Sequence, residues 1–237
     1  MRLHMPISPA LLLGLGTWLL YVTDRILDGL RPGERLRERH HFHARHRTAF
    51  LVAASLLFLP LAWYVLTRMR REAFHDDLYI GVFALLYLFA VHRRIAPLRL
   101  PKELAVAVLF AAATAVPAWS RINAGREQLI PAVVFFALLC WINCAGIEKW
   151  EGGAPHPSTR WASLHLRAIV TAIALFSTAA AVLAPSRGLT TVYLAALFSS
   201  ALLFALDARS SRLSPLHLRI AADAALLTPL ALFPFAR

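Results

Sequence analysis

Long apolar runs separated by short polar gaps make up most of this chain. The runs carry few charges, and most approach the roughly 20 residues that a helix needs to cross a bilayer core of about 30 Å. Eight such runs lie at 7–23, 49–67, 78–91, 104–119, 129–147, 164–184, 189–206 and 216–235. The pattern predicts an all-α, multi-span transmembrane bundle of about eight helices, with the short third and fourth runs extended by flanking residues or packed inside the bundle.

The composition indicates an integral membrane protein. Of the 237 residues, 59% are hydrophobic and 16% are charged, whereas a soluble domain carries about a quarter charged residues. At roughly 30 residues for each span with its loop, eight spans fill the chain, so we expect a single transmembrane domain over residues 1–237. The first run lacks a small-residue cleavage site and continues into Asp24, so we interpret it as a span and not as a signal peptide.

The distribution of positive charge predicts the orientation of these spans. Lys and Arg number 25 against 13 Asp and Glu, and 17 of the 25 lie in the gaps after the first, third, fifth and seventh runs when Arg167 and Arg219, in the first turn of the runs that follow, are counted with them. The positive-inside rule places those gaps in the cytoplasm and both termini outside, with Arg68, Arg70 and Arg71 as the exception. Because no nucleic-acid-binding motif is present, we expect membrane lipids or phosphorylated substrates, and no nucleic acid, as partners of the basic residues.

Two pairs of carboxylates lie at the ends of apolar runs. Asp24 and Asp28 are four residues apart, Glu148 and Glu151 are three apart, and each pair therefore shares one helical face. The stretch Asp24-Arg25-Ile26-Leu27-Asp28-Gly29 also resembles Glu148-Lys149-Trp150-Glu151-Gly152, with one deletion. A repeat at a distance of 124 residues suggests two four-helix halves, 1–120 and 121–237.

The charges of these pairs indicate a cation site. Both pairs fall in gaps assigned to one side of the membrane, where four carboxylates facing one another would repel unless cations lay between them. Mg²⁺ suits such oxygen ligands and commonly binds through carboxylates together with substrate phosphates. Basic residues that can contact phosphate oxygens lie in the same gaps, namely Arg25, Arg31, Arg93, Arg94, Lys102 and Arg160. The alternative is structural, with each acid paired locally to a neighbouring Arg.

With these residues the chain resembles the UbiA-type intramembrane prenyltransferases. In that family an Asn-Asp-x-x-Asp-x-x-x-Asp motif, often with Arg after its middle Asp, and a second acidic motif four helices later bind Mg²⁺ and an isoprenyl diphosphate. Asp24, Arg25 and Asp28 match the later part of the first motif, and Glu148 and Glu151 stand where the second belongs. Pro101-Lys102-Glu103-Leu104 after Arg93-Arg94 is a further, weaker similarity.

The chain departs from the family pattern at several positions. Leu20 and Tyr21 occupy the places of the Asn and the first Asp, and the second motif uses Glu at a spacing of three. The family has nine helices with its first motif on the second helix, whereas here the matching stretch ends the first run. We expect that the family's first helix is missing, which leaves eight spans and an outward N-terminus.

The resemblance implies a Mg²⁺-dependent membrane prenyltransferase that transfers an isoprenyl group from an isoprenyl diphosphate to an aromatic or lipid-like acceptor. It implies metal ligation and catalysis by Asp24, Asp28, Glu148 and Glu151, and diphosphate contacts from Arg25, Arg31, Arg94 and Lys102. We expect the site to face the cytoplasm from a bacterial inner membrane. The alternatives are a non-catalytic lipid-binding membrane protein and a small cation-coupled transporter.

Three further polar features have structural explanations. His40, His41, His43 and His46 match no zinc-site spacing, so we favour a basic lipid-facing or substrate-capping loop over a metal site. For Arg219 and Asp223, four apart in the last run, we favour a local ion pair over a place in the polar cavity. Asn143 and Cys144 either line that cavity or join helices, and Cys140 and Cys144 share an apolar run without implying a disulfide.

Overall fold

The structure is a computed structural model of the chain, and it describes residues 8–29, 42, 45–69, 71–92, 102–122, 124–152 and 156–232. Over these residues every regular element is a helix, which confirms the predicted all-α class. Arg31 and Arg94, two of the expected diphosphate contacts, lie outside the described residues, as do His40, His41 and His43.

Six helices are long and apolar enough to cross a membrane, which indicates an integral membrane protein. They are α1 (Ser8–Gly29), α3 (Arg47–Arg68), α5 (Lys102–Trp119), α6 (Ile130–Trp150), α8 (Leu166–Leu183) and α9 (Arg187–Ala208). The expected run 78–91 lies in α4 (Arg71–His92), and the run 216–235 is divided between α10 (Pro215–Ala225) and α11 (Thr228–Leu232). The number of about eight spans therefore stays a prediction.

The interruption between α10 and α11 has a local cause. The Ser199 hydroxyl donates to the carbonyl oxygen of Ala225 over 2.8 Å, and the Thr228 hydroxyl donates to the carbonyl oxygen of Ala195 over 2.9 Å. Pro229, the second residue of α11, has no N–H to donate to a preceding turn. Because non-helical backbone at membrane depth needs a substitute partner, the Ser199 hydroxyl stabilises the break, and the Thr228 hydroxyl attaches the beginning of α11 to α9.

The chain forms two compact units, and the first consists of residues 1–98 and 116–123. In this unit α1 contacts both α3 and α4. Val22 and Ile26 of α1 are buried, whereas no residue of α3 is buried. The outward side chains of α3, including Leu59, Trp63 and Leu66, are apolar, as expected for a helix that contacts lipid.

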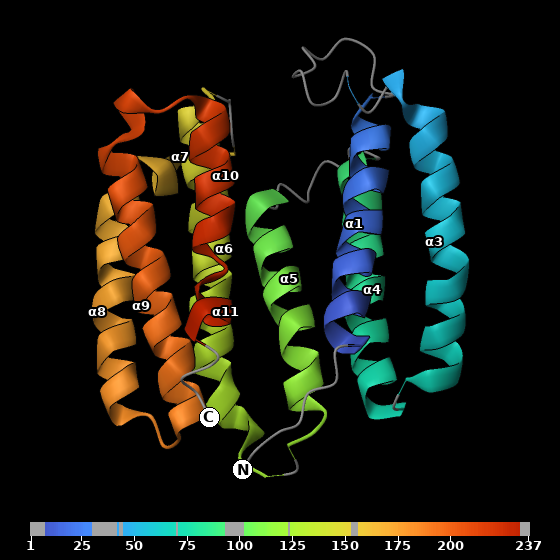
Figure 1. Cartoon of the computed structure of the whole chain (residues 1–237), viewed down its shortest axis with the longest axis horizontal. Helices are drawn as coiled ribbons and strands as arrows, with labels where there is room; N and C mark the ends of the chain where they lie inside the picture. The colour runs from blue at the N-terminus through green and yellow to red at the C-terminus, as the bar shows by residue number, and fades with distance from the viewer. Residues whose placement is uncertain are drawn as a thin grey trace. The chain divides into compact units, whose positions relative to one another are not determined.

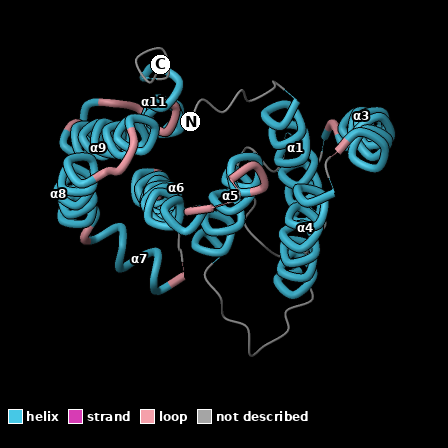
Figure 2. The backbone as a smooth tube through the Cα atoms, turned by 90° about the horizontal axis from the view of Figure 1, so that it is seen from below, coloured by secondary structure: helices cyan, strands magenta, loops and turns pink. Residues whose placement is uncertain are grey.

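The second unit consists of residues 99–115 and 124–237, and within it α6 contacts α7, α8, α9 and α10. Helices α8 and α9 pack closely against each other and against α6, while α10 also contacts α6 and α9 (Figures 1 and 2). Residues of α6, α8 and α9 with small or branched side chains form the core: Leu139, Ile142, Ala145, Val170, Ile173, Ala196 and Leu203. The short helix α7 (Pro157–Leu164) is seen lengthwise in Figure 2, where α6, α8 and α9 are seen close to end-on.

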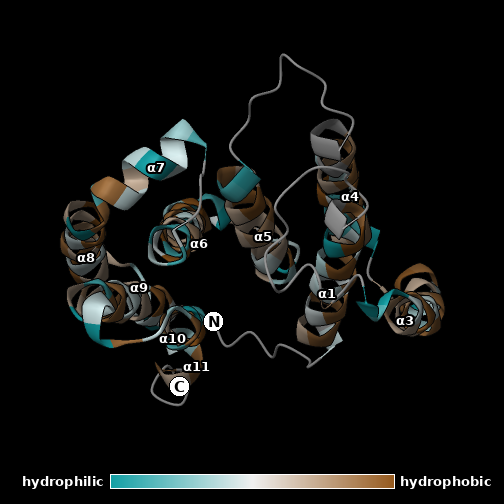
Figure 3. Cartoon of the chain, turned by 90° about the horizontal axis from the view of Figure 1, so that it is seen from above, coloured by the Kyte–Doolittle hydropathy of each residue, from teal (hydrophilic) through white to brown (hydrophobic). Residues whose placement is uncertain are grey.

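The charged residues of the second unit gather at one end of its helices. The ends of α6 and α9 and the beginnings of α8 and α10 lie together there, and hydrophilic turns are visible at this end in Figure 3. We call it the charged end. Its basic residues are Lys149, Arg160, Arg167, Arg209, Arg212 and Arg219, whereas the opposite end has Arg126, in the 3₁₀ helix η1 (Arg126–Leu129), and Arg187.

We expect the two ends of α9 to lie on opposite sides of the membrane, with the charged end in the cytoplasm. The test uses Gly188→Cys, at the beginning of α9, and Ser211→Cys, beyond its end, because both positions are exposed. A membrane-impermeant maleimide should label Gly188→Cys from outside the cell and Ser211→Cys only in inverted vesicles. Cys140 and Cys144 lie within α6, so the unaltered chain gives the background.

Labelling of both positions from one side would show that α9 does not cross the membrane. Labelling with the two sides exchanged would show that the predicted orientation is wrong.

Candidate functional site

The first acidic pair lies near the end of α1, in the first unit. The Asp24 side chain is buried, and its Oδ2 is 3.4 Å from Nη2 of Arg25. The Arg25 guanidinium in turn lies over the Tyr21 ring, with its carbon 5.1 Å from the ring centroid. Asp24 therefore has the local ion pair of the structural alternative, and the side chain of Asp28 lies outside the described part of the chain.

The second acidic pair lies at the end of α6, in the second unit. Glu148 and Glu151 are both partly buried, and Glu151 Oε1 is 3.8 Å from Nη1 of Arg219 on α10. One turn before Glu148, the Cys144 thiol lies near enough to Glu103, Glu148 and Asp223 for electrostatic interaction. We call the side of α6 that carries Glu148 and Glu151 the acidic face, with Arg219 of α10 at its edge.

The beginning of α5 is linked to the same end of the unit. Lys102 is the first residue of α5 and is partly buried. Next to it, the Glu103 carboxylate accepts a hydrogen bond of 2.9 Å from the hydroxyl of Thr159, a residue of α7 that is fully buried. Glu103 was not among the residues singled out for the site, although it belongs to the Pro101-Lys102-Glu103-Leu104 stretch.

The favoured local pair of Arg219 with Asp223 is wrong. Arg219 contacts Glu151, and Asp223 Oδ1 accepts a hydrogen bond of 3.0 Å from the side-chain amide of Asn143. Glu151 and Asn143 both lie on α6. Contacts between α10 and α6 therefore take the place of the predicted pair within α10. Asn143 is buried, and its own Oδ1 has no hydrogen-bond partner among the described residues.

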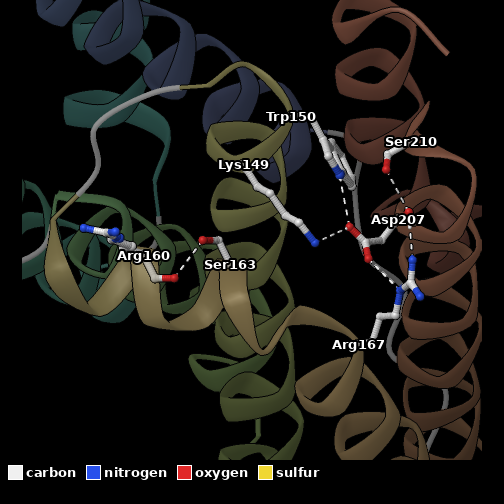
Figure 4. A network of polar contacts seen from close by, with 7 residues as sticks. All are labelled: Lys149, Trp150, Arg160, Ser163, Arg167, Asp207 and Ser210. Atoms are coloured by element: carbon white, nitrogen blue, oxygen red, sulfur yellow. Dashed lines mark hydrogen bonds and ion pairs between the residues drawn. The ribbon is translucent and has the colours of Figure 1, made fainter. Parts of the chain in front are cut away.

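The opposite face of the end of α6 contains a second polar centre, built around Asp207 of α9. Asp207 is 2% exposed. Its Oδ1 accepts from Lys149 Nζ at 2.7 Å and from Trp150 Nε1 at 3.2 Å, and its Oδ2 accepts from Arg167 Nε at 2.8 Å (Figure 4). Its backbone oxygen accepts from Arg167 Nη2 and from the Ser210 hydroxyl. We call Lys149, Trp150, Arg167 and Asp207 the Asp207 cluster.

The folding of α6 and α9 explains why these groups meet. Buried residues follow one face of α9 at helical spacing, and Asp207 continues the stripe of Tyr193, Ala196, Ser200 and Leu203. On α6, a Cβ atom at Gly146 would lie 3.1 Å from Leu166 Cδ1 and 3.2 Å from Cη2 of Trp150. The absence of a side chain at Gly146 therefore lets the Trp150 indole pack close to α6, in the orientation that donates to Asp207.

The Asp207 cluster neutralises a buried carboxylate, whose burial without partners would cost free energy. An ionised carboxylate in an apolar bundle requires cationic or hydrogen-bonding partners. Lys149 and Arg167 supply two positive charges for one negative charge, and their side chains remain 39% and 56% exposed. Sequence reasoning missed Asp207, although an acid that continues the buried stripe of a helix is a signal that can identify such a residue.

The expected magnesium site has suitable donors but is not assembled within the described residues. Carboxylate oxygens fit the preference of Mg²⁺, but no group of three or more His, Cys, Asp or Glu side chains that could bind a metal ion occurs in the described ranges. Asp24 belongs to the first unit and Glu148 to the second. The expectation that the two acidic pairs share ions therefore stays a prediction.

Comparison of the chain with protein-family models, with curated proteins and with solved structures found no match. The resemblance to the UbiA-type enzymes therefore rests on the motif residues alone, and it enters below as part of a proposal.

Replacement of Asp207 by Ala should destabilise the protein by about 1.5–3 kcal/mol, because the hydrogen bonds to charged donors are lost. Lys149 and Arg167 can return to water, so the loss should stay below that for a fully buried pair. Unfolding in mixed micelles with increasing dodecyl sulfate measures the change. Glu127→Ala, an exposed acid at the opposite end, is the matched control and should change stability by less than about 0.5 kcal/mol. Equal effects of the two substitutions would contradict a stabilising role for the cluster.

Proposed function

We propose that the protein is a membrane prenyltransferase that transfers an isoprenyl group from an isoprenyl diphosphate to a hydrophobic acceptor. One observation carries the proposal: charged and polar side chains of α6 and α10 contact each other toward the charged end, where Glu103 of α5 is bonded to α7, in a unit whose helices are otherwise apolar. A substrate with an anionic head and an apolar tail has the matching distribution of polarity. The motif residues Asp24, Arg25, Asp28, Glu148 and Glu151 support the same class through their resemblance to the UbiA-type enzymes.

The basic residues would bind the diphosphate. Arg219 lies beside the acidic face, Lys102 lies at the beginning of α5, and Arg25 lies beside Asp24 in the first unit. Guanidinium and ammonium groups donate charge-assisted hydrogen bonds to phosphate oxygens. These contacts would become stronger as negative charge develops on the leaving group, and they would therefore stabilise the transition state.

Asp24, Asp28, Glu148 and Glu151 would bind Mg²⁺, which when bound neutralises charge on the diphosphate. In the transfer itself, the bond between the allylic carbon and the diphosphate oxygen breaks, and inorganic diphosphate leaves with the electron pair. The acceptor forms a new bond to the allylic carbon and releases a proton.

Apolar residues of the same unit suit the tail of the substrate. The rings of Phe110 on α5 and Phe136 on α6 are in contact, with centroids 5.9 Å apart. Phe110 is seven residues after Glu103 on one helix, which is about 10 Å along its axis. A prenyl chain bound by its diphosphate at the acidic face would therefore reach these rings within a few isoprene units, away from water.

The first test measures whether isoprenyl diphosphates stabilise the purified protein against heat in the presence of Mg²⁺. We expect farnesyl or geranylgeranyl diphosphate to raise the midpoint of unfolding, since a ligand at 100 times its dissociation constant stabilises by about 2.7 kcal/mol. The increase should disappear with a chelator and in Glu148→Gln. Glu127→Gln, the same substitution at the opposite end, should keep it.

Release of diphosphate during incubation with a panel of aromatic and lipid acceptors then tests for transfer. Stabilisation without product from any acceptor would favour the non-catalytic lipid-binding protein. Stabilisation by Mg²⁺ alone, with no effect of any diphosphate, would favour a cation transporter and end the proposal.

A further inference from the structure

The Asp207 cluster has more donors than the protein uses. An ammonium group has three N–H bonds and a guanidinium group has five. Lys149 uses one of its N–H bonds on Asp207, and Arg167 uses two, through Nε and Nη2. Within the described part of the chain these two side chains make no other hydrogen bonds to side chains, so donors remain on both. With two positive charges and one negative charge, the cluster has a net charge of +1.

An exposed aromatic ring lies directly beside this charge. Phe204 precedes Asp207 by about one turn of α9, and its side chain is 41% exposed. The Arg167 guanidinium carbon is 6.0 Å from the centroid of the Phe204 ring. An apolar surface of α9 therefore begins next to the cationic groups, on the side toward the middle of the helix.

We propose that the Asp207 cluster binds the phosphate of an anionic phospholipid, with the acyl chains of the lipid along Phe204. Lys149 and Arg167 donate to the phosphate oxygens, and Asp207 fixes the positions of the two donors before the lipid arrives. This site does not rest on the proposed prenyltransferase function. The acidic face with Glu148 and Glu151 lies on another side of α6, since adjacent helical residues differ in direction by about 100°.

The location of the cluster favours a lipid over a free phosphate ion. Lys149 and Asp207 lie in the last turns of two candidate spans, and Arg167 lies in the first turn of a third. The ends of a helix that crosses a bilayer lie at the level of the head groups, where an anionic leaflet attracts Lys and Arg by about 1 kcal/mol per residue. Trp150 is at the same level, as is common for indole groups at membrane interfaces. A guanidinium group also offers two donors in the geometry of phosphate oxygens.

The test measures lipid selectivity of the full-length protein in detergent, after addition of phosphatidylglycerol or phosphatidylcholine with identical acyl chains. Native mass spectrometry counts the lipids retained, and a thermal melt gives the stabilisation. We expect phosphatidylglycerol to be retained at least fivefold more than phosphatidylcholine and to raise the melting midpoint further. Glycerol phosphate, which has the head-group anion without acyl chains, should not reproduce the effect.

The variant Arg167→Gln tests whether the lipid binds at the Asp207 cluster. Lys149 and Trp150 still donate to Asp207 in this variant, so the fold should persist while the selectivity falls at least threefold. Arg187→Gln, an exposed Arg at the other end of α9, is the matched control and should leave the selectivity unchanged. A phosphatidylglycerol with a photoreactive group near the start of an acyl chain should label the peptide that contains Phe204 in the unaltered protein, even if Arg167→Gln does not fold.

Three results would overturn the proposal. The first is equal retention of the two lipids by the unaltered protein. The second is an equal loss of selectivity in Arg167→Gln and Arg187→Gln, which would indicate attraction by total charge. The third is that glycerol phosphate reproduces the full effect of phosphatidylglycerol, which would indicate a site for a soluble phosphate.

Discussion

A buried carboxylate in an apolar bundle has to be neutralised by groups from the protein, and at Asp207 this requirement determines how three helices meet. The partners come from the end of α6 and the beginning of α8, 58 and 40 residues away in the sequence. Packing of apolar side chains alone would let α6 rotate or slide, because lipid chains solvate the same surfaces. The hydrogen bonds from Lys149, Trp150 and Arg167 have one geometry, so they fix the rotation of α6 about its axis.

This rotation separates the charges at the end of α6 into two groups. Lys149 and Trp150 donate to Asp207 of α9, whereas Glu151 pairs with Arg219 of α10. Asn143, one turn and a half before Glu148, adds a further contact of α6, by donating to Asp223 of α10. The end of α6 thus has two different faces. On one face, Lys149 and Arg167 carry more positive charge than Asp207 neutralises. On the other face, Glu151 lies beside Arg219.

The sequence predicted the features that depend on local pattern. It did not predict the contacts between residues that are far apart in the chain. Runs of apolar residues predicted helices, and the spacing of Glu148 and Glu151 predicted a shared face near basic residues. Spacing also favoured a pair of Arg219 with Asp223, but α6 offers each a better partner. Asp207 was not predicted as a site residue, because its hydrogen-bond partners are far away in the sequence. The break after Ala225 depends on Ser199, whose hydroxyl lies on another helix.

The separation of charge also bears on the proposed chemistry. If Lys149 lay on the acidic face, its ammonium group would pair with Glu148 or Glu151 and compete with a divalent cation for their oxygens. Asp207 binds that ammonium group at 2.7 Å on the other side of the helix, which keeps it away from the acids. Arg219 remains beside Glu151, but at 3.8 Å its guanidinium group makes a long contact that a phosphate oxygen can replace. The buried acid of α9 therefore acts on the candidate site through α6 without being part of it.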